Sequence, residues 1–535
     1  MTEDLLIFNA NIRTMDAACP GASWVALRDG CIADLGSGAP PDATTSIDAG
    51  GRLVLPGFQD AHIHLLNGGT DLVETAQLYH VTTIAGLQSA LKAHADTTRG
   101  PIVWGAGWQT GFFGAHNLTR AVLDAVIPDR PCLIYDGNFH MACLNSTACK
   151  IVGLTRATPD PQNGHVSRDA SGYPTGMLHE AAINWACESL PGTSAETLDH
   201  GLLAAQTLAN RHGITGVLDP SIQSYHVRTY AKAVAANALT LRVAGACLIT
   251  AADAVDAAVA RLTALRAAHG SRDFHLHSAK FFLDGGLENR TAAMLQPYAD
   301  ASGGNAPLMF AQHHLNALFC ALDAARFQIH CHCIGDAATD AALNGFQAAR
   351  AANGTWPSLR QIAHVEGVAP ADRARFAALG VMANMQPLWA AWDPEVPDDT
   401  MAMVGPDRMA QVYGFRSLID AGAPYCLSSD WAVTSLNPFP IIATAVLRQP
   451  VPKRSAALLP AERITVEQAV LGYTVHAASA CWRGSYTGQI TRGYSADLIL
   501  LDRDIFTIDP YDIAETNVLL TWFQGREVYR SAVWA

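Results

Sequence analysis

Leu55-Pro56-Gly57-Phe58-Gln59-Asp60-Ala61-His62-Ile63-His64 is the stretch of this sequence that says most about its fold. Phe58 to His62 predicts a buried strand. Alternate residues of a strand project to the same side, so Asp60, His62 and His64 are expected to share one face. Two imidazoles at this spacing can bind one metal ion, for which zinc is the usual choice. The motif alone is weak support, because short motifs of this kind also arise by chance.

Three His-x-His pairs occur among the 20 histidines, at His62/His64, His275/His277 and His330/His332. For an isolated pair, hydrogen-bonded histidines within a strand are the simpler interpretation. The first pair gains weight because other potential ligands fall at the ends of further predicted strands, namely Lys280, His332, His364 and Asp430. Five strand ends thus each offer a ligand, and the C-terminal ends of strands are where barrels place their active sites.

The alternation of strands and helices predicts the fold class. From about residue 200, short buried strands alternate with alanine-rich helical runs such as 251–268 and 338–352, which is typical of βαβ units and a parallel sheet. With Phe58 to His62 there are eight predicted strands, which fits an α/β fold with a closed (β/α)8 TIM-like barrel. The other seven are Gly216–Leu218, Leu241–Ala244, Ser278–Leu283, Gln328–His332, Gln361–His364, Val381–Met385 and Tyr425–Ser428.

Both chain ends are rich in short strands and turns. Apolar runs at 5–8, 24–27 and 52–55 precede the barrel, and similar runs at 496–501 and 518–522 follow it. A lone hairpin is marginally stable in water, so the two ends are expected to build one small β-sandwich. The predicted domains are 1–57 together with 479–535, and a barrel over 58–478. Within the barrel domain, a large insertion after strand 1, residues 65–200, is expected to cover the barrel mouth.

Composition excludes several classes of protein. The 535 residues carry 35 basic and 48 acidic side chains, a formal charge of −13. Without clustered Lys and Arg, neither nucleic acid nor an anionic membrane is expected as a partner. No apolar run of about 18 residues predicts a membrane helix, and the acidic N-terminus is unlike a secretory signal. Twelve cysteines without a CxxC pair suggest reduced thiols and a cytoplasmic protein, and a homo-oligomer is possible.

As an ordered set, the motifs of this chain resemble those of the metal-dependent amidohydrolase superfamily. The resemblance is strongest to its long-chain branch, amidohydrolase family 3, which includes N-substituted formamide deformylases, and it runs nearly end to end. The matching motifs are Pro56-Gly57-Phe58 with His62-Ile63-His64, Trp108, Asp136-Gly137, His140 to Asn145-Ser146, Pro174-Thr175-Gly176 with Glu180, Lys280 with Asp284-Gly285, His332 with Ile334-Gly335-Asp336, Gln386-Pro387, and Gly488-Gln489-Ile490 to Ala496-Asp497-Leu498. They are specific for family and fold, and much less so for substrate.

The resemblance implies a centre with one or two divalent metal ions. By position, His62, His64 and Asp430 would hold the more buried ion, and His332 and His364 the second. Lys280 would bridge both ions as a carbamate made from its amine and carbon dioxide. A carbamate is anionic and offers two oxygens, whereas an ammonium with a pKa near ~10.4 repels a metal. The alternative for Lys280 is a barrel lysine paired with Asp284.

The sequence departs from the family pattern at Ala363, where this branch often has Glu. A carboxylate that would orient His364 is therefore missing, or is replaced by Glu366. His330 lies on the strand face of His332 but deeper in the barrel, which favours a core role over ligation. Strand alternation turns His275, His277, Cys331 and Cys333 away from the site.

The expected function is hydrolysis of an amide-type, non-peptide C–N bond, with an N-substituted formamide or an N-aryl or N-alkyl amide as the best single guess. Asp430 would take a proton from water, whose pKa a metal lowers toward ~7, and return it to the leaving amine. Aromatic side chains near strand ends or in the insertion favour an apolar or aromatic substrate group. The candidate contacts are Trp108, His140, Trp389 and Trp431, with Phe112, Phe113 and Trp392, and core or lid packing is their alternative role.

Three rival functions remain. A lactone, ester or other carbonyl or phosphoester hydrolase would share the same binuclear site, and the sequence does not separate it from an amide hydrolase. A deaminase of this fold would normally use one metal and no bridging lysine. A non-catalytic scaffold would be expected to have lost ligands. Both of these are disfavoured, since all six candidate ligands are present.

Overall fold

The computed structural model describes residues 5–98, 100–109, 118–137, 139–300, 303–391, 400–451 and 453–534. Two compact units are present. The first is formed by the described parts of Met1–Leu65, Gln206–Glu395 and Thr400–Ala535, and the second by those of Leu66–Ala205. Three of the aromatic candidates, Phe112, Phe113 and Trp392, lie outside the described residues.

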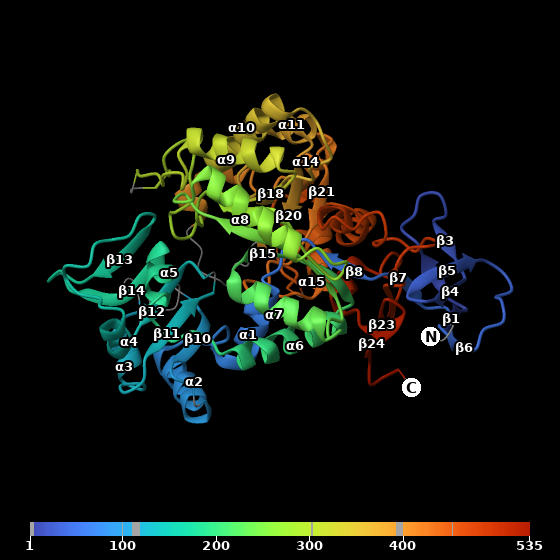
Figure 1. Ribbon diagram of the computed structural model, residues 1–535, viewed down its shortest axis with the longest axis horizontal. Helices are drawn as coiled ribbons and strands as arrows, with labels where there is room; N and C mark the ends of the chain where they lie inside the picture. Colours follow the sequence, from blue (N-terminus) through green and yellow to red (C-terminus); the bar gives the residue numbers. More distant parts are fainter. Residues whose placement is uncertain are drawn as a thin grey trace. The chain divides into compact units, whose positions relative to one another are not determined.

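The first unit is built around an eight-stranded parallel sheet (Figure 1). Its order is β21-β20-β19-β18-β17-β16-β15-β8, so neighbours in the barrel sequence are neighbours in space, as in a TIM-like barrel. The strands are β8 (Phe58–Asp60), β15 (Ile214–Ile222), β16 (Arg242–Ile249), β17 (Phe274–Phe282), β18 (Gln328–Cys333), β19 (Gln361–His364), β20 (Met382–Met385) and β21 (Tyr425–Leu427). Each overlaps a predicted strand, and the predicted fold class is confirmed.

Hydrogen bonds between the segments that follow β21 and β8 bring the two edges of this sheet together. The amide of Asp430 donates to the carbonyl of His62 at 2.8 Å, and the amide of His64 donates to the carbonyl of Trp431 at 2.6 Å. The barrel is thus nearly closed at the C-terminal ends of its strands. The closure brings the backbone of two predicted ligands, His62 and Asp430, into direct contact.

Helices alternate with the strands and pack against them; α9 and α10, for example, contact β18. Helix α10 begins at Asp336, whose negative charge suits a helix N-terminus, and ends before Gly354, where φ is +77°. The helices are α6 (Ala195–Arg211), α7 (Ser224–Ala235), α8 (Val255–Ala268), α9 (Gln312–Ala324), α10 (Asp336–Asn353), α11 (Pro370–Leu379), α12 (Thr400–Val404), α13 (Pro406–Met409), α14 (Phe415–Asp420), α15 (Pro438–Leu447), α16 (Val466–Leu471) and α17 (Ala477–Ala480). Short helical turns are η2 (Pro387–Trp389), η3 (Pro460–Glu462), η4 (Gly472–His476) and η5 (Pro510–Glu515).

Two further sheets form a β-sandwich from both ends of the chain. One has the order β24-β23-β22-β7-β2-β3, in which C-terminal strands pair with N-terminal ones, and the other has the order β5-β4-β1-β6. Their shared core includes Ile7, Val25, Leu500 and Trp522. The strands are β1 (Leu5–Phe8), β2 (Asn11–Arg13), β3 (Gly21–Ala22), β4 (Trp24–Arg28), β5 (Cys31–Gly36), β6 (Thr45–Asp48), β7 (Leu53–Pro56), β22 (Leu498–Leu501), β23 (Val518–Phe523) and β24 (Arg526–Arg530).

The second unit follows the first barrel strand in the sequence and has its own mixed sheet, of order β13-β14-β12-β11-β10-β9. The adjacent residues Leu133 and Ile134 of β11 belong to different apolar clusters, so both faces of this sheet are covered. Its elements are α1 (Leu65–Glu74), β9 (Thr75–Gln77), α2 (Ile84–Thr97), β10 (Val103–Trp108), α3 (Arg120–Asp124), β11 (Cys132–Asp136), β12 (Met141–Leu144), α4 (Ser146–Ile151), β13 (Gly164–Arg168), β14 (Pro174–Glu180) and α5 (Ala181–Cys187). None of the described helices in either unit combines the length and hydropathy that spanning a membrane requires.

Candidate metal centre

The three side chains expected to hold the first metal meet at the C-terminal end of the barrel. Nε2 of His62 and Nε2 of His64 each lie 3.4 Å from Oδ1 of Asp430. Neighbouring ligands of a tetrahedral zinc ion, bound at about 2.1 Å, are about 3.4 Å apart. The three side chains are therefore spaced as a metal ion of this size requires.

The backbone at this histidine pair differs from the prediction. Strand β8 ends at Asp60, so that His62 and His64 lie beyond the strand rather than on it. The buried Asp60 carboxylate explains the change, because its Oδ1 accepts hydrogen bonds from the amides of His62 at 3.1 Å and Ser429 at 3.2 Å. Burial raises the pKa of Asp60 to about 7, although hydrogen bonds from Ser429 and His62 oppose the shift.

Two of the predicted ligands have a strained backbone. His364 and Asp430 have φ values of +80° and +56°, in the left-handed region that residues other than glycine rarely adopt. Such conformations cost energy and tend to cluster at functional sites. They bring Nδ1 of His364 to 3.9 Å from Oδ2 of Asp430. The carboxylate that faces the first histidine pair with one oxygen therefore faces His364 with the other.

His332 joins the same cluster from strand β18. Its ring centroid lies 4.4 Å from that of His364. Its Nε2 lies 3.2 Å from the carbonyl oxygen of Gly285 and 3.8 Å from Oδ1 of Asp284. A carbonyl oxygen and an ionised carboxylate can accept hydrogen bonds but cannot donate them. Nε2 of His332 is therefore assigned the hydrogen, and Nδ1 has the lone pair that could bind a metal.

Asp284 has a structural role that the sequence did not reveal. Its buried carboxylate accepts hydrogen bonds from the amides of Ile334 at 3.0 Å, Gly335 at 2.7 Å and Ala293 at 3.0 Å. The loops after β17 and β18 are thereby joined at the site. A Cβ atom on Gly335 would lie 1.9 Å from the Ala293 carbonyl oxygen, so this close approach requires glycine.

Lys280 is buried on β17, where it pairs in register with His330 of β18. Its Nζ has no hydrogen-bond partner among the described residues, so the pairing with Asp284 that was the alternative is not seen. Burial lowers the pKa of Lys280 to about 8, against the opposing effect of the Asp430 carboxylate. A buried amine without a partner is an expensive group to keep, and it fits a side chain that is modified or bound in the working protein.

The structure places Glu366 beside Tyr413. The tyrosine hydroxyl donates to Oε1 of Glu366 at 2.6 Å, and Glu366 is buried. That Glu366 replaces a carboxylate orienting His364 stays a prediction. Trp389 stacks on His364 instead, with ring centroids 5.2 Å apart and an angle of 20° between the planes. An aromatic face therefore supports this imidazole.

The predicted substrate contacts divide between the two units. Trp389 and Trp431 belong to the barrel centre, Trp389 through His364 and Trp431 through its carbonyl, which accepts from the amide of His64. Trp108 is 1% exposed and belongs to an apolar cluster of the second unit. This placement matches core packing, the alternative role. His140 also belongs to the second unit. The substrate-binding roles of all four stay predictions.

His140 forms a close pair with Glu180, to which the sequence assigned no role beyond its motif. Nδ1 of His140 lies 3.0 Å from both carboxylate oxygens of Glu180. Glu180 has φ +50° and ψ −125°, a strained conformation at the start of α5. The sequence feature that could have indicated this pair is the charge of Glu180 at the end of the motif that begins at Pro174.

Polar side chains on or directly after the neighbouring strands β19, β20 and β21 form a hydrogen-bonded chain. Nε2 of Gln361 donates to the carbonyl of Ala480, which leaves its Oε1 to accept from Nδ2 of Asn384 at 2.8 Å. Oδ1 of Asn384 then accepts from the hydroxyl of Ser428 at 2.6 Å and from Nε2 of Gln386 at 2.9 Å. Each amide orientation follows from the one before, starting at a backbone carbonyl. The order of donors and acceptors therefore holds the ends of β20 and β21 in place.

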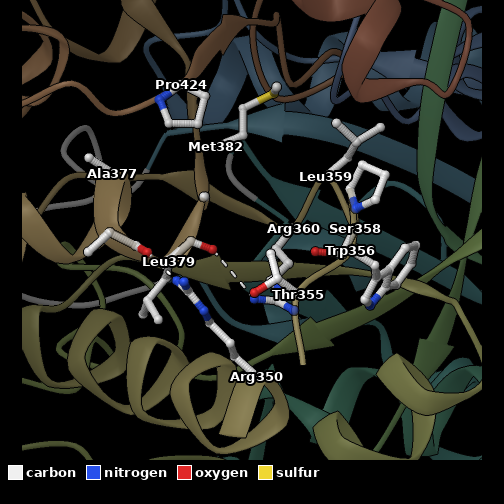
Figure 2. Close-up of a pocket in the computed structure, with 13 residues that line it drawn as sticks. Arg350, Thr355, Trp356, Ser358, Leu359, Arg360, Ala377, Leu379, Met382 and Pro424 are labelled. Carbon is white, nitrogen blue, oxygen red and sulfur yellow. Dashed lines mark hydrogen bonds between the residues drawn. The ribbon is translucent and has the colours of Figure 1, made fainter. Parts of the chain in front are cut away.

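A cavity of about 330 Å³ lies near the N-terminal ends of β19, β20 and β21 (Figure 2). Its lining includes Arg350, Trp356, Arg360 and Met382, and none of the candidate ligands. Arg360 already has a counter-ion, because its guanidinium donates to the carboxylate of Asp323 at 2.8 Å. The cavity is therefore separate from the candidate metal centre.

The chain is similar to known proteins along nearly its whole length. The amidohydrolase family matches residues 45–529. Protein LONG AFTER FAR-RED 3 of Arabidopsis thaliana is 30% identical over 98% of this chain and 91% of its own length. N-substituted formamide deformylase of Arthrobacter pascens is 29% identical over 98% of this chain and 97% of its own. The crystal structure of an uncharacterized metal-dependent hydrolase from Pyrococcus horikoshii shares the fold, with a TM-score of 0.76 and 23% identity over 95% of this chain and 99% of that one. This chain belongs to the amidohydrolase family of metal-dependent hydrolases.

Proposed function

We propose that this protein hydrolyses an amide-type, non-peptide C–N bond, with an N-substituted formamide or another N-aryl or N-alkyl amide as its substrate. The observation that carries the proposal is the meeting of His62, His64 and Asp430 at the C-terminal end of the barrel, at metal-ligand spacing. The relative that is named for deformylation of N-substituted formamides supports the substrate class.

The donor set fits a centre of one or two divalent ions, and zinc suits its imidazoles and carboxylate. His62, His64 and Asp430 would hold the first ion, His332 and His364 the second, and Lys280 would bridge them. A bound ion would polarise the substrate carbonyl and lower the pKa of water toward ~7. The presence of three imidazoles around one carboxylate supports the proposal, because imidazole nitrogens and a carboxylate oxygen are the donors that zinc prefers.

Lys280 is proposed to act as a carbamate. Its neutral amine would add to the carbon of carbon dioxide, form an N–C bond and release one proton, leaving an anionic group with two oxygens. The burial of Nζ without a hydrogen-bond partner supports this step, since the Asp430 charge and the Phe282 ring, 4.6 Å from Nζ, only partly offset the cost of burying an ammonium. The carbamate would restore the charge balance of the centre once cations are bound.

Asp430 is proposed as the catalytic residue that moves the proton. It would take a proton from water as the water oxygen bonds to the substrate carbonyl carbon. It would then give that proton to the amine nitrogen as the C–N bond breaks, because an amide anion is too poor a leaving group. The products are a carboxylic acid, formic acid for a formamide, and a free amine. Its position between His62, His64 and His364 supports this role.

The substrate contacts are proposed as the sequence predicts them. Trp389 and Trp431 would contact an apolar or aromatic group of the substrate, and Trp108 and His140 are proposed as further contacts. Glu180 would hold the hydrogen of His140 on Nδ1, which leaves the lone pair on Nε2. A cytoplasmic location and assembly into a homo-oligomer remain predictions from the sequence.

Metal analysis joined to a substrate panel tests the proposal. The full-length protein, purified without chelators, is expected to contain one or two zinc ions per chain. It should hydrolyse N-alkyl and N-aryl formamides faster than carbamates, lactones, esters or cyclic ureas of matched size. Turnover of lactones or esters alone would assign the same centre to the rival chemistry. Absence of bound metal and of any turnover would favour a scaffold.

A further inference from the structure

His330 lies on β18, two residues before His332, and is fully buried. Its Nε2 lies 2.8 Å from Nδ1 of His62, with the ring centroids 4.8 Å apart. We propose that His330 is a positioning residue, which sets the tautomer and ring orientation of His62 and thereby strengthens metal binding at His62, His64 and Asp430. The inference rests on the proposed function, because it requires a metal ion at this site.

A metal ion bound to His62 would fix the positions of the hydrogen atoms. Nε2 of His62 faces Asp430, so this is the atom that would offer its lone pair to a metal. The hydrogen of a neutral His62 must then be on Nδ1, which points at Nε2 of His330. His330 accepts that hydrogen bond only if its own hydrogen is on Nδ1, a buried atom that has no hydrogen-bond partner among the described residues. The two imidazoles thus form one directed pair, with the lone pair of His62 turned toward the site.

The carboxylate that lies closest to His62 in the sequence, that of Asp60, already accepts other hydrogen bonds. Metal-binding histidines usually donate their second N–H to a carboxylate, a carbonyl or water. Asp60 is two residues from His62, but its Oδ1 accepts from the backbone amides of His62 and Ser429. A neutral imidazole therefore occupies the position that a carboxylate often has. Because His62 is itself buried, loss of this acceptor would leave a buried N–H unsatisfied and the ring free to turn.

A purely structural role makes a different prediction. If His330 only fills space in the barrel core, an apolar side chain of similar size should serve equally well. If it accepts the hydrogen bond of His62, then an acceptor at the position of Nε2 is what matters. Glutamine can place its Oε1 near that position, whereas leucine cannot accept a hydrogen bond at all. The two substitutions therefore separate the roles.

The experiment measures zinc affinity, not turnover. Full-length wild-type, His330→Leu and His330→Gln proteins are stripped of metal, and zinc dissociation constants are measured by competition with a chromophoric chelator. His330→Leu is expected to bind zinc about 10- to 100-fold more weakly, and His330→Gln to stay within about threefold of wild type. Equal affinity in the wild-type and Leu proteins, or equal weakness in the Gln and Leu proteins, would overturn the inference.

His275→Leu is the matched control. His275 is a buried histidine of the neighbouring strand β17, and its ring lies 4.6 Å from that of His277. The same change there should leave zinc affinity unaltered, and thermal unfolding of each metal-free variant reports on folding. If the wild-type protein binds no zinc, the result contradicts the proposed function itself and not only the role of His330. If His330→Leu does not fold, ¹⁵N-histidine NMR of zinc-loaded wild type decides: His330 with its hydrogen on Nδ1 supports the inference, and on Nε2 overturns it.

Discussion

The histidines of the barrel centre and His140 of the second unit have opposite surroundings. His140 has a carboxylate of its own, because both oxygens of Glu180 lie 3.0 Å from its Nδ1. In the barrel, His62, His64 and His364 face a single carboxylate, that of Asp430, and the buried amine of Lys280 has no hydrogen-bond partner among the described residues.

The difference separates two kinds of functional arrangement. In the second unit, His140 and Glu180 are hydrogen-bond partners of each other as they stand, so the pair needs nothing added to hold its geometry. The barrel centre brings together more basic groups than its one carboxylate can satisfy, at a cost in folding free energy. Such a centre would gain stability from a bound cation and from the carbamate proposed for Lys280. The substitutions below test this contrast.

The largest effect is expected from Asp430→Asn. An amide cannot take the proton from water, so kcat should fall about 10²- to 10⁴-fold, while the amide oxygen and the remaining ligands should retain metal. Turnover of an N-substituted formamide and zinc content are measured on the same preparation. Asp420→Asn, at an exposed pair with Arg416, is the control and should behave as wild type. A near wild-type rate in Asp430→Asn would remove the proposed role.

Lys280→Met should show opposite effects on stability and binding. Replacing a buried ammonium by an apolar side chain should raise the free energy of unfolding of the metal-free protein by roughly 2–4 kcal/mol at pH 7, because burial has lowered the pKa of Lys280. The same variant should lose a metal ion and turnover. Denaturant unfolding and metal analysis measure the two effects. Lys92→Met, at an exposed position, should change neither, and a destabilised Lys280→Met protein would contradict the contrast.

Asp136 predicts a pH dependence within the second unit. Burial raises its pKa to about 6 from 3.8, so between these values the native state keeps a proton that the unfolded chain has released. The free energy of unfolding should therefore fall as the pH rises from about 4 to 6, by roughly 1–2 kcal/mol. Asp136→Asn should lack this part of the fall in denaturant titrations across that range. A fall of equal size in the variant would assign it to other groups.

Glu180→Gln should have the smallest effect. The amide keeps a hydrogen-bond acceptor for His140 but loses the charge, so kcat/KM should fall about three- to tenfold. Zinc affinity should be unchanged, and this result distinguishes the pair of the second unit from the barrel centre. Glu188→Gln, at the other end of α5, is the control. A weaker zinc affinity in Glu180→Gln would show that the two arrangements are not independent.

Much of the fold could be predicted because each barrel strand is a short buried run between alanine-rich helices. Gln361–His364, for example, is both the predicted range and the range of β19. The candidate ligands could be found for the same reason, since they follow such runs. The way in which these ligands come together could not be predicted, because it depends on the positions at which the backbone departs from regular strand geometry. His62 and His64 lie beyond β8, and His364 has a left-handed backbone.

Side-chain contacts between residues far apart in the sequence could not be predicted from the alternation of strands and helices either. His330 and His62 are 268 residues apart, and only the closure of the barrel reveals their hydrogen bond. Position on a strand face favoured a core role for His330, and its burial agrees, but strand alternation gives no information on which atom faces which neighbour. The amide contacts of Asp284 and the pair of His140 with Glu180 share this property.

The β-sandwich built from both chain ends has a consequence for synthesis on the ribosome. Nε2 of Gln489 donates to the carbonyl of Met15, 474 residues earlier in the chain, and strand β7 pairs with β22. The first strands therefore emerge long before their partners exist. At about 5–20 residues per second, the wait is roughly 25–95 seconds. Throughout that time the edge of β7 and the apolar side chains behind it are open to other strands, which makes the nascent N-terminal segment a natural client for a chaperone.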